Sequence, residues 1–362
     1  MTAALVSALE RKLAGGTFGR GDDIRRTGTA YYRGLGALCA QTCGLDPADL
    51  APAAAPQLES LRRGVLDAAL RLLLAGDVPQ GRALLAEHAA YRRARQDDPA
   101  LTADTEPSGP RPAALKAWHG NPAGEELVAR FNTSMAGTAD TSVVATVPVT
   151  TELEAALAEA AAVLTTALPL IGPDVVDGIA VGIYDGAMNS GYYAGTPLVI
   201  YVSDRVFADP VRAAEIVLHE SLHQKLADLG VARDILRAGY VDESSELLPV
   251  PWGGRGRLFS ADRSLAAYHV YTHQSLFYLS LLCRGAGDEA RLTSSLVKSW
   301  ARAHHFARGA ETPAFAAEYG VDGRRLTAWL AEVVDALAGV PLADGSVLRA
   351  HAEGYSGVAV AS

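Results

Sequence analysis

Apolar residues recur every three or four positions along much of the chain, with charged residues between them. Segments 58–74 and 81–95 show this spacing clearly, and it is typical of amphipathic helices that bury one face. Residues 97–125 interrupt it, because they are dense in proline, glycine and aspartate, which favour turns and loops. The pattern predicts a helical N-terminal region over residues 1–96, followed by a linker or long surface loop.

Further along, the pattern predicts a small sheet among helices. Residues 151–168 form an alanine-rich stretch that ends before Pro169, as a helix would. Two short β-like runs follow, GIAVGIYD at 178–185 and PLVIYVS at 197–203. Because turn residues fill the interval between them, we expect the two runs to form an antiparallel pair with a long loop.

The next predicted helix carries the most informative motif of the chain. Asp209 is suited to cap its first N–H groups, Pro210 fits the first helical position, and Gly230 is expected to end it in the left-handed conformation. Inside it, the stretch VLHESLHQKLADLG contains His219 and His223. Residues four apart stand on the same helical face, so both imidazoles can point at one metal ion.

Glu220 projects about 100° round the helix from His219, which places it near the metal without aligning it with the imidazoles. The competing interpretation is a chance pair of histidines on an apolar face, satisfied by hydrogen bonds. The capping residues and the preceding β-like run both indicate that the two histidines lie within a rigid helix, and we therefore favour metal binding. The fold is therefore expected to be α+β and mainly α-helical. Its metal-binding catalytic domain, with a small antiparallel sheet, would cover residues 126–300, and residues 301–362 would form a C-terminal helical region.

A long helix predicted over residues 264–283 offers a third ligand. It carries His269 and, one turn later, His273. One histidine from this helix would complete a three-nitrogen face and leave open coordination positions opposite, while the other would orient a ligand or contact substrate. Each of them is alternatively a buried polar residue beside tyrosines.

The same motif also occurs in zinc peptidases. Leu226 and Leu229 stand where the metzincin pattern requires a glycine and a third histidine. A glutamate ligand downstream, Glu243 or Glu246, remains compatible with a peptidase in which Glu220 is the general base. Zinc peptidase chemistry is therefore a standing alternative.

Three arginines, Arg255, Arg257 and Arg263, lie within nine residues of an otherwise acidic chain. An arginine fork holds a carboxylate by two charge-assisted hydrogen bonds, although surface cations on a solvated loop would give the same pattern. The tyrosines of the GYYAG stretch, Tyr192 and Tyr193, are candidates to line a substrate cleft, or else to pack in the interior.

The net charge of the chain limits the classes of partner that it is expected to bind. The formal net charge is −9 and the predicted pI about 5.5, a balance that argues against broad binding to nucleic acids or anionic membranes. No run of about 18 apolar residues occurs, and the N-terminal MTAALVSALERKLAGG has charges where a secretory signal would be apolar. Three cysteines are too few for a disulfide framework. We therefore expect a cytoplasmic protein.

The stretch LHESLHQKL, followed by Pro-Trp, by arginines and by a helix with a histidine near its start, resembles the HExxH-motif peptide-modification family. These proteins are described as 2-oxoglutarate- and iron-dependent peptide β-hydroxylases of ribosomal peptide biosynthesis. The resemblance covers roughly residues 140–300. One departure is that Gly253 and Gly254 separate the Pro-Trp pair from Arg255, whereas in the family an arginine tends to follow directly.

The resemblance implies Fe(II) held by His219, His223 and His269. It further implies 2-oxoglutarate anchored by Arg263 or Arg257, O₂ as the oxidant, and a precursor peptide as substrate, with Trp252 beside the cleft. The predicted reaction is hydroxylation of the β-carbon of a peptide residue. The alternatives are the zinc peptidase and a non-catalytic peptide-binding partner in a biosynthetic cluster.

Overall fold

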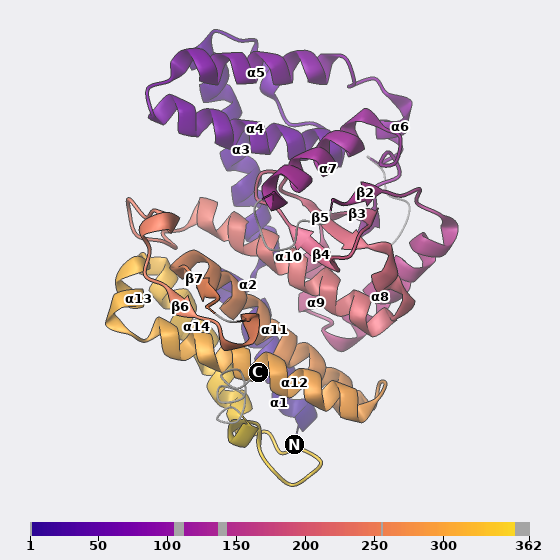
Figure 1. Ribbon diagram of the computed structural model, residues 1–362, viewed down its shortest axis with the longest axis vertical. Helices are drawn as coiled ribbons and strands as arrows, with labels where there is room; N and C mark the ends of the chain where they lie inside the picture. Colours follow the sequence, from indigo (N-terminus) through magenta and orange to yellow (C-terminus); the bar gives the residue numbers. More distant parts are fainter. Residues whose placement is uncertain (1, 105–111, 137–142, 255, 352–362) are drawn as a thin grey trace. The chain divides into compact units, whose positions relative to one another are not determined.

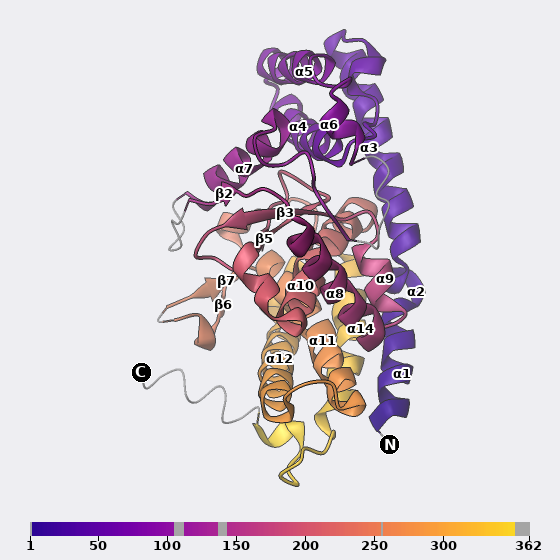
Figure 2. The ribbon, with the colours of Figure 1, turned by 90° about the vertical axis from the view of Figure 1, so that its right-hand side faces the viewer.

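The computed structural model describes residues 2–104, 112–136, 143–254 and 256–351 (Figures 1 and 2). The chain forms two compact units: unit 1 contains Met1–Ile24, Ala167–Asp174 and Lys225–Ser362, and unit 2 contains Arg25–Thr166 and Val175–Gln224. The described residues are 68% helical and 8% strand, which confirms the α+β, mainly α-helical expectation. Among the described residues, every helix is too short or too polar to cross a membrane.

Most helices expected from the apolar spacing are present. The predicted segments 58–74, 81–95 and 151–168 correspond to α4, α5 and α8, each within a few residues of the expected bounds. In chain order, the helical elements before residue 180 are α1 (Thr2–Ala14), α2 (Gly16–Gly19), α3 (Gly21–Cys43), η1 (Pro47–Leu50), α4 (Pro56–Leu74), α5 (Val78–Arg93), α6 (Pro99–Thr102), α7 (Pro122–Met135), α8 (Thr151–Ala167) and α9 (Ile171–Val176).

Unit 2 contains a mixed sheet with strand order β1-β3-β5-β4, and a further strand, β2, also pairs with β3. Its strands are β1 (Ala113–Ala114), β2 (Ala145–Thr146), β3 (Ala180–Asp185), β4 (Ser190–Tyr192) and β5 (Val199–Ser203). The expected antiparallel pairing of 178–185 with 197–203 is wrong, since β3 and β5 are parallel. The loop between them contains β4, which runs antiparallel to β5, so the chain reverses direction twice.

The core of unit 2 lies between this sheet and α7. Figure 2 shows α7 and α10 (Pro210–Ala232) on opposite sides of the strands. Trp118 is fully buried, and its Nε1 donates a hydrogen bond of 2.6 Å to the Ile183 carbonyl. Phe131 of α7 stacks on Tyr201 of β5, with ring centroids 4.1 Å apart. Residues 97–125 were expected to form a linker or surface loop, but Trp118 from this stretch is part of the hydrophobic core.

Unit 1 is built mainly from helices, with a two-stranded antiparallel ribbon of β6 (Leu248–Pro249) and β7 (Leu258–Phe259). The long helix predicted over 264–283 is α11, which begins three residues earlier because the Ser260 side chain caps it. The remaining elements of the chain are η2 (Asp204–Ala208), α10 (Pro210–Ala232), η3 (Asp242–Ser244), η4 (Pro251–Gly253), α11 (Ala261–Arg284), α12 (Glu289–Ala310), α13 (Pro313–Glu318) and α14 (Val321–Ala338).

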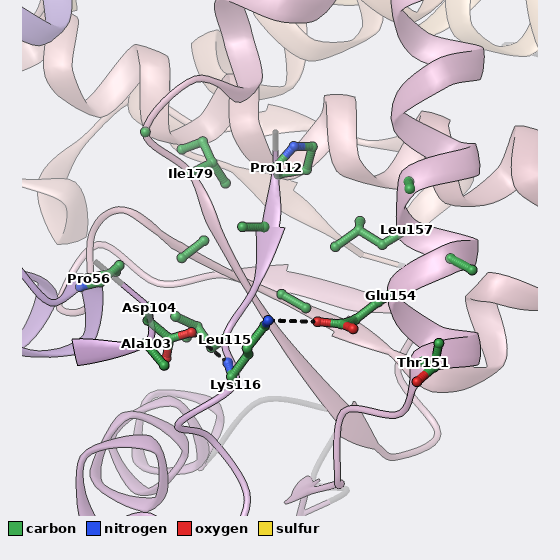
Figure 3. Close-up of a pocket in the computed structure, with 16 residues that line it drawn as sticks. Pro56, Ala103, Asp104, Pro112, Leu115, Lys116, Thr151, Glu154, Leu157 and Ile179 are labelled. Atoms are coloured by element: carbon green, nitrogen blue, oxygen red, sulfur yellow. Dashed lines mark hydrogen bonds and ion pairs between the residues drawn. The ribbon is translucent and has the colours of Figure 1, made fainter. Parts of the chain in front are cut away.

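A cavity of about 380 Å³ opens in unit 2 beside β1 and α8 (Figure 3). Its lining is mostly small and apolar, and Lys116 and Glu154 form an ion pair of 3.6 Å across it. Among the residues that the structure describes, none of those predicted to bind metal, cosubstrate or peptide lines this cavity. The predicted chemistry therefore lies elsewhere in the fold.

Candidate metal centre

The metal helix α10 begins as the sequence predicts. The Asp209 carboxylate accepts hydrogen bonds from the backbone N–H groups of Val211 (3.0 Å) and Arg212 (3.1 Å), which satisfies donors that have no partner inside the helix. Its predicted end is wrong, because α10 continues through Gly230 to Ala232. A glycine costs a helix only about 1 kcal/mol relative to alanine, and the residues that follow it continue the helix.

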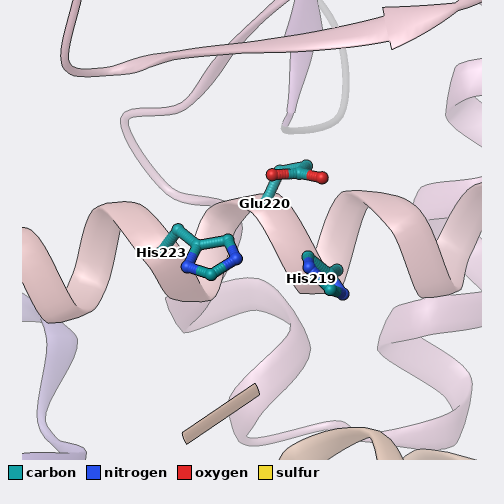
Figure 4. Close-up of side chains that lie close together, drawn as sticks. All are labelled: His219, Glu220 and His223. Carbon is teal, nitrogen blue, oxygen red and sulfur yellow. The ribbon is translucent and has the colours of Figure 1, made fainter. Parts of the chain in front are cut away.

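His219 and His223 present their imidazoles on one face of α10 (Figure 4). Their ring centroids are 5.0 Å apart, with an angle of 63° between the ring planes. One potential ligand atom from each of His219, Glu220 and His223 lies within 4.8 Å of the others. Both histidines are partly exposed. Small side-chain rotations would bring two nitrogens to the ~2 Å that a metal ion requires.

His223 is prepared to bind as a neutral imidazole. Burial lowers its pKa to about 4, so the ring is uncharged near neutral pH, as a metal ligand must be. The Tyr192 ring lies nearly parallel to it, with centroids 6.1 Å apart and an interplanar angle of 16°. Tyr192, predicted at the substrate cleft, therefore lies beside the histidine pair.

Glu220 is buried, with 5% of its surface exposed. Its Oε1 accepts a 2.7 Å hydrogen bond from the Ser190 hydroxyl on β4. Burial raises the pKa of this carboxyl to about 7, the Ser190 hydrogen bond opposes that rise, and Glu215 adds to it. Ser190 is a site residue that the sequence analysis missed, because the contact spans 30 positions and depends on where β4 lies.

Gln224, which follows His223 in α10, is also held in place by a hydrogen bond to the chain just before β5. Gln224 Oε1 accepts a 2.6 Å hydrogen bond from the backbone N–H of Leu198, a residue with a positive φ of 70°. Tyr193 packs against the hydrophobic core of unit 2. Of the two tyrosines in GYYAG, only Tyr192 stacks on a histidine of the pair.

The two histidines of α11 belong to unit 1, and both are fully buried. His273 Nδ1 lies 2.8 Å from the His269 carbonyl oxygen, and since a carbonyl only accepts, this nitrogen carries the proton. Its Nε2 has no hydrogen-bond partner among the described residues. Burial lowers the pKa of His273 to about 3; the His269 hydrogen bond opposes this, and Lys225 adds to it. His273 Nε2 thus has a free lone pair, while the third-ligand role of His269 stays a prediction.

The arginines predicted to hold a carboxylate lie at the surface where the structure describes them. Arg257 and Arg263 are exposed, with the Arg257 guanidinium 5.1 Å from the Phe259 ring centroid, and Arg255 lies outside the described residues. Trp252 packs edge-on against Tyr271, with ring centroids 6.3 Å apart.

Glu243 and Glu246, the alternative third ligands of a zinc peptidase, are both exposed and belong to unit 1.

Comparison with known proteins assigns no family: no protein-family model matches the chain, and no curated protein matches it significantly. The chemistry of the centre is therefore inferred from its own residues.

Proposed function

We propose that the protein binds Fe(II) through His219 and His223 and acts as a 2-oxoglutarate-dependent oxygenase. The substrate would be a ribosomally made precursor peptide, hydroxylated at the β-carbon of one residue. The observation that carries the proposal is the pair of imidazoles on one face of α10, together with the low pKa of His223. The resemblance of LHESLHQKL to peptide β-hydroxylases selects this chemistry among those that a histidine pair supports.

Each residue of the centre has a distinct part. His219 and His223 would hold the ion, which supplies Lewis acidity and oxygen activation when bound. Ser190 holds the Glu220 carboxylate by hydrogen bonding, so Glu220 would orient a neighbouring group and not bind the ion itself. Tyr192 would cover the His223 ring and restrict access of water to it.

The decisive experiment adds Fe(II) and 2-oxoglutarate to anaerobic metal-free protein and records the visible spectrum. A weak charge-transfer band, absent in His219→Ala protein, is expected. Addition of the precursor peptide and exposure to O₂ should then yield succinate, CO₂ and a peptide heavier by one oxygen atom. Protein that binds iron but gives no band at saturating 2-oxoglutarate would end the oxygenase assignment.

A zinc peptidase is the second candidate, and Glu220 is the residue that favours it. A carboxyl with a pKa near 7 is well matched to general-base catalysis at neutral pH. The Glu220→Gln variant separates the two functions, because a peptidase needs this carboxylate to take a proton from water. Loss of nearly all peptide cleavage with zinc retained would favour the peptidase, whereas retained iron and some hydroxylation would favour the oxygenase.

A further inference from the structure

Unit 1 contains an arginine on α12, Arg302, in a setting unlike that of the arginines predicted from the sequence. It is partly buried, and its guanidinium carbon lies 5.2 Å from the ring centroid of Trp252 and 5.2 Å from that of Tyr271. Two aromatic rings thus hold the cation by cation–π attraction. Phe306 supports both rings, with its centroid 5.5 Å from that of Trp252 and 6.2 Å from that of Tyr271.

The hydrogen bonds of Arg302 leave one edge of the guanidinium unused. Nη1 donates to the Tyr271 hydroxyl at 3.1 Å. Nε is buried and has no partner among the described residues. Leaving a buried donor unpaired is costly, and an unpaired donor in a folded protein calls for an explanation. A ligand that accepts from this edge would supply one.

Among the described residues, Arg302 also has no acidic partner, unlike the two buried arginines of α4. Arg62 and Arg63 both contact the Glu59 carboxylate, at 2.6 Å and 2.8 Å. Within the part of the chain that the structure describes, Arg302 has no such ion pair, and its one hydrogen bond goes to a neutral hydroxyl. An anion that binds here would therefore pair with a charge that no carboxylate of the described residues neutralises.

We propose that Arg302 binds the carboxylate of a small organic acid through its Nε and Nη2 groups. These two donors lie on one edge of the planar guanidinium and point the same way, which matches the two oxygens of a carboxylate. The site lies within unit 1 and does not depend on the metal. The identification of the acid as 2-oxoglutarate rests on the proposed function.

Because Nε is buried, a carboxylate reaches it only if neighbouring side chains move. Trp252 is partly exposed and its ring faces the guanidinium, so its fluorescence should change when an acid binds. Trp118 and Trp300 are fully buried and Trp329 packs against Phe18, so their emission should change less. The Trp252→Phe variant should therefore lose most of the fluorescence response.

The test measures binding of succinate and of 2-oxoglutarate to full-length protein by calorimetry, with and without metal. Succinate has no keto group, so its binding to metal-free protein reports the arginine alone. We expect Arg302→Gln and Arg302→Lys to weaken succinate binding roughly tenfold to a hundredfold, the usual effect of losing hydrogen bonds to a charged group. Arg302→Lys keeps the positive charge but lacks the two parallel N–H donors of the guanidinium. It serves as the test variant if Arg302→Gln does not fold.

The matched control is Arg308→Gln, which removes the same charge from the same helix at an exposed residue paired with Glu311. It should bind both acids normally. Acid binding that Arg302 variants leave unchanged would overturn the proposal, as would phosphate binding as tightly as succinate, or no acid binding in wild-type protein. Iron-dependent 2-oxoglutarate binding that is insensitive to Arg302 would refute this site while supporting the oxygenase. Arg302-dependent succinate binding in a protein that takes up no metal would support this site and refute the oxygenase.

Discussion

Replacing Glu220 by glutamine should stabilise the metal-free protein at alkaline pH. Burial raises the pKa of this carboxyl from its ordinary 4.5 to about 7, a difference of about 2.5 units. At about 1.4 kcal/mol per unit, ionised Glu220 costs the folded state roughly 3 kcal/mol. Glutamine has nearly the same shape and can still accept a hydrogen bond from Ser190, but it carries no charge to desolvate.

The sign of the pH dependence follows from proton binding. Between pH 4.5 and 7 the folded protein binds more protons at Glu220 than the unfolded chain, so stability falls as pH rises through this window. Below pH 4.5 the carboxyl is protonated in both states and the cost disappears. Glu220→Gln should therefore exceed wild type by about 3 kcal/mol at pH 8 and by almost nothing at pH 4.

Urea unfolding in the presence of a chelator, followed by circular dichroism at both pH values, measures this difference. Glu215→Gln is the matched control, since Glu215 is also buried on α10 but forms an ion pair with Arg212, and its loss should not stabilise the protein. Bound metal should shrink the gain, because a nearby cation lowers the pKa of Glu220. A gain of equal size at pH 4 and pH 8, or none at pH 8, would show that the Glu220 charge is not costly.

Three further predictions concern the metal pair and unit 2. His219→Ala should reduce bound metal, measured by elemental analysis, to the background of chelated protein. Gly64→Ala should destabilise the protein by roughly 1–3 kcal/mol, since the new Cβ would stand 1.8 Å from the Gly195 carbonyl oxygen. Gly34→Ala is the control, because a Cβ there faces open space and should not destabilise the fold. Thermal unfolding of the two variants measures the difference. Burial lowers the pKa of His88 from 6.5 to about 4, so stability falls as pH drops through that window. His88→Gln should reduce the loss between pH 7 and pH 4.5, and an unchanged acid profile would contradict this.

The helices and the metal motif were predictable because their signals are local. The cap at Asp209 and the four-residue spacing of the histidines are visible in the sequence, and the structure confirms the helix that carries them. The parallel pairing of β3 with β5 was not predictable from turn residues, because the intervening β4 is the strand that pairs antiparallel with β5. Ser190 and Arg302 escaped notice for a related reason: each acquires its setting from a residue at least 30 positions away.

Helix α10 contributes residues to both compact units, with the division between Gln224 and Lys225. A fragment designed to isolate unit 2 would therefore stop one residue after His223, in the middle of a helix. Its last four carbonyl groups would lose their intrahelical partners, and the turn that carries both imidazoles would fray. Dissection of this protein into autonomous pieces should consequently abolish metal uptake even when every proposed ligand of α10 is retained.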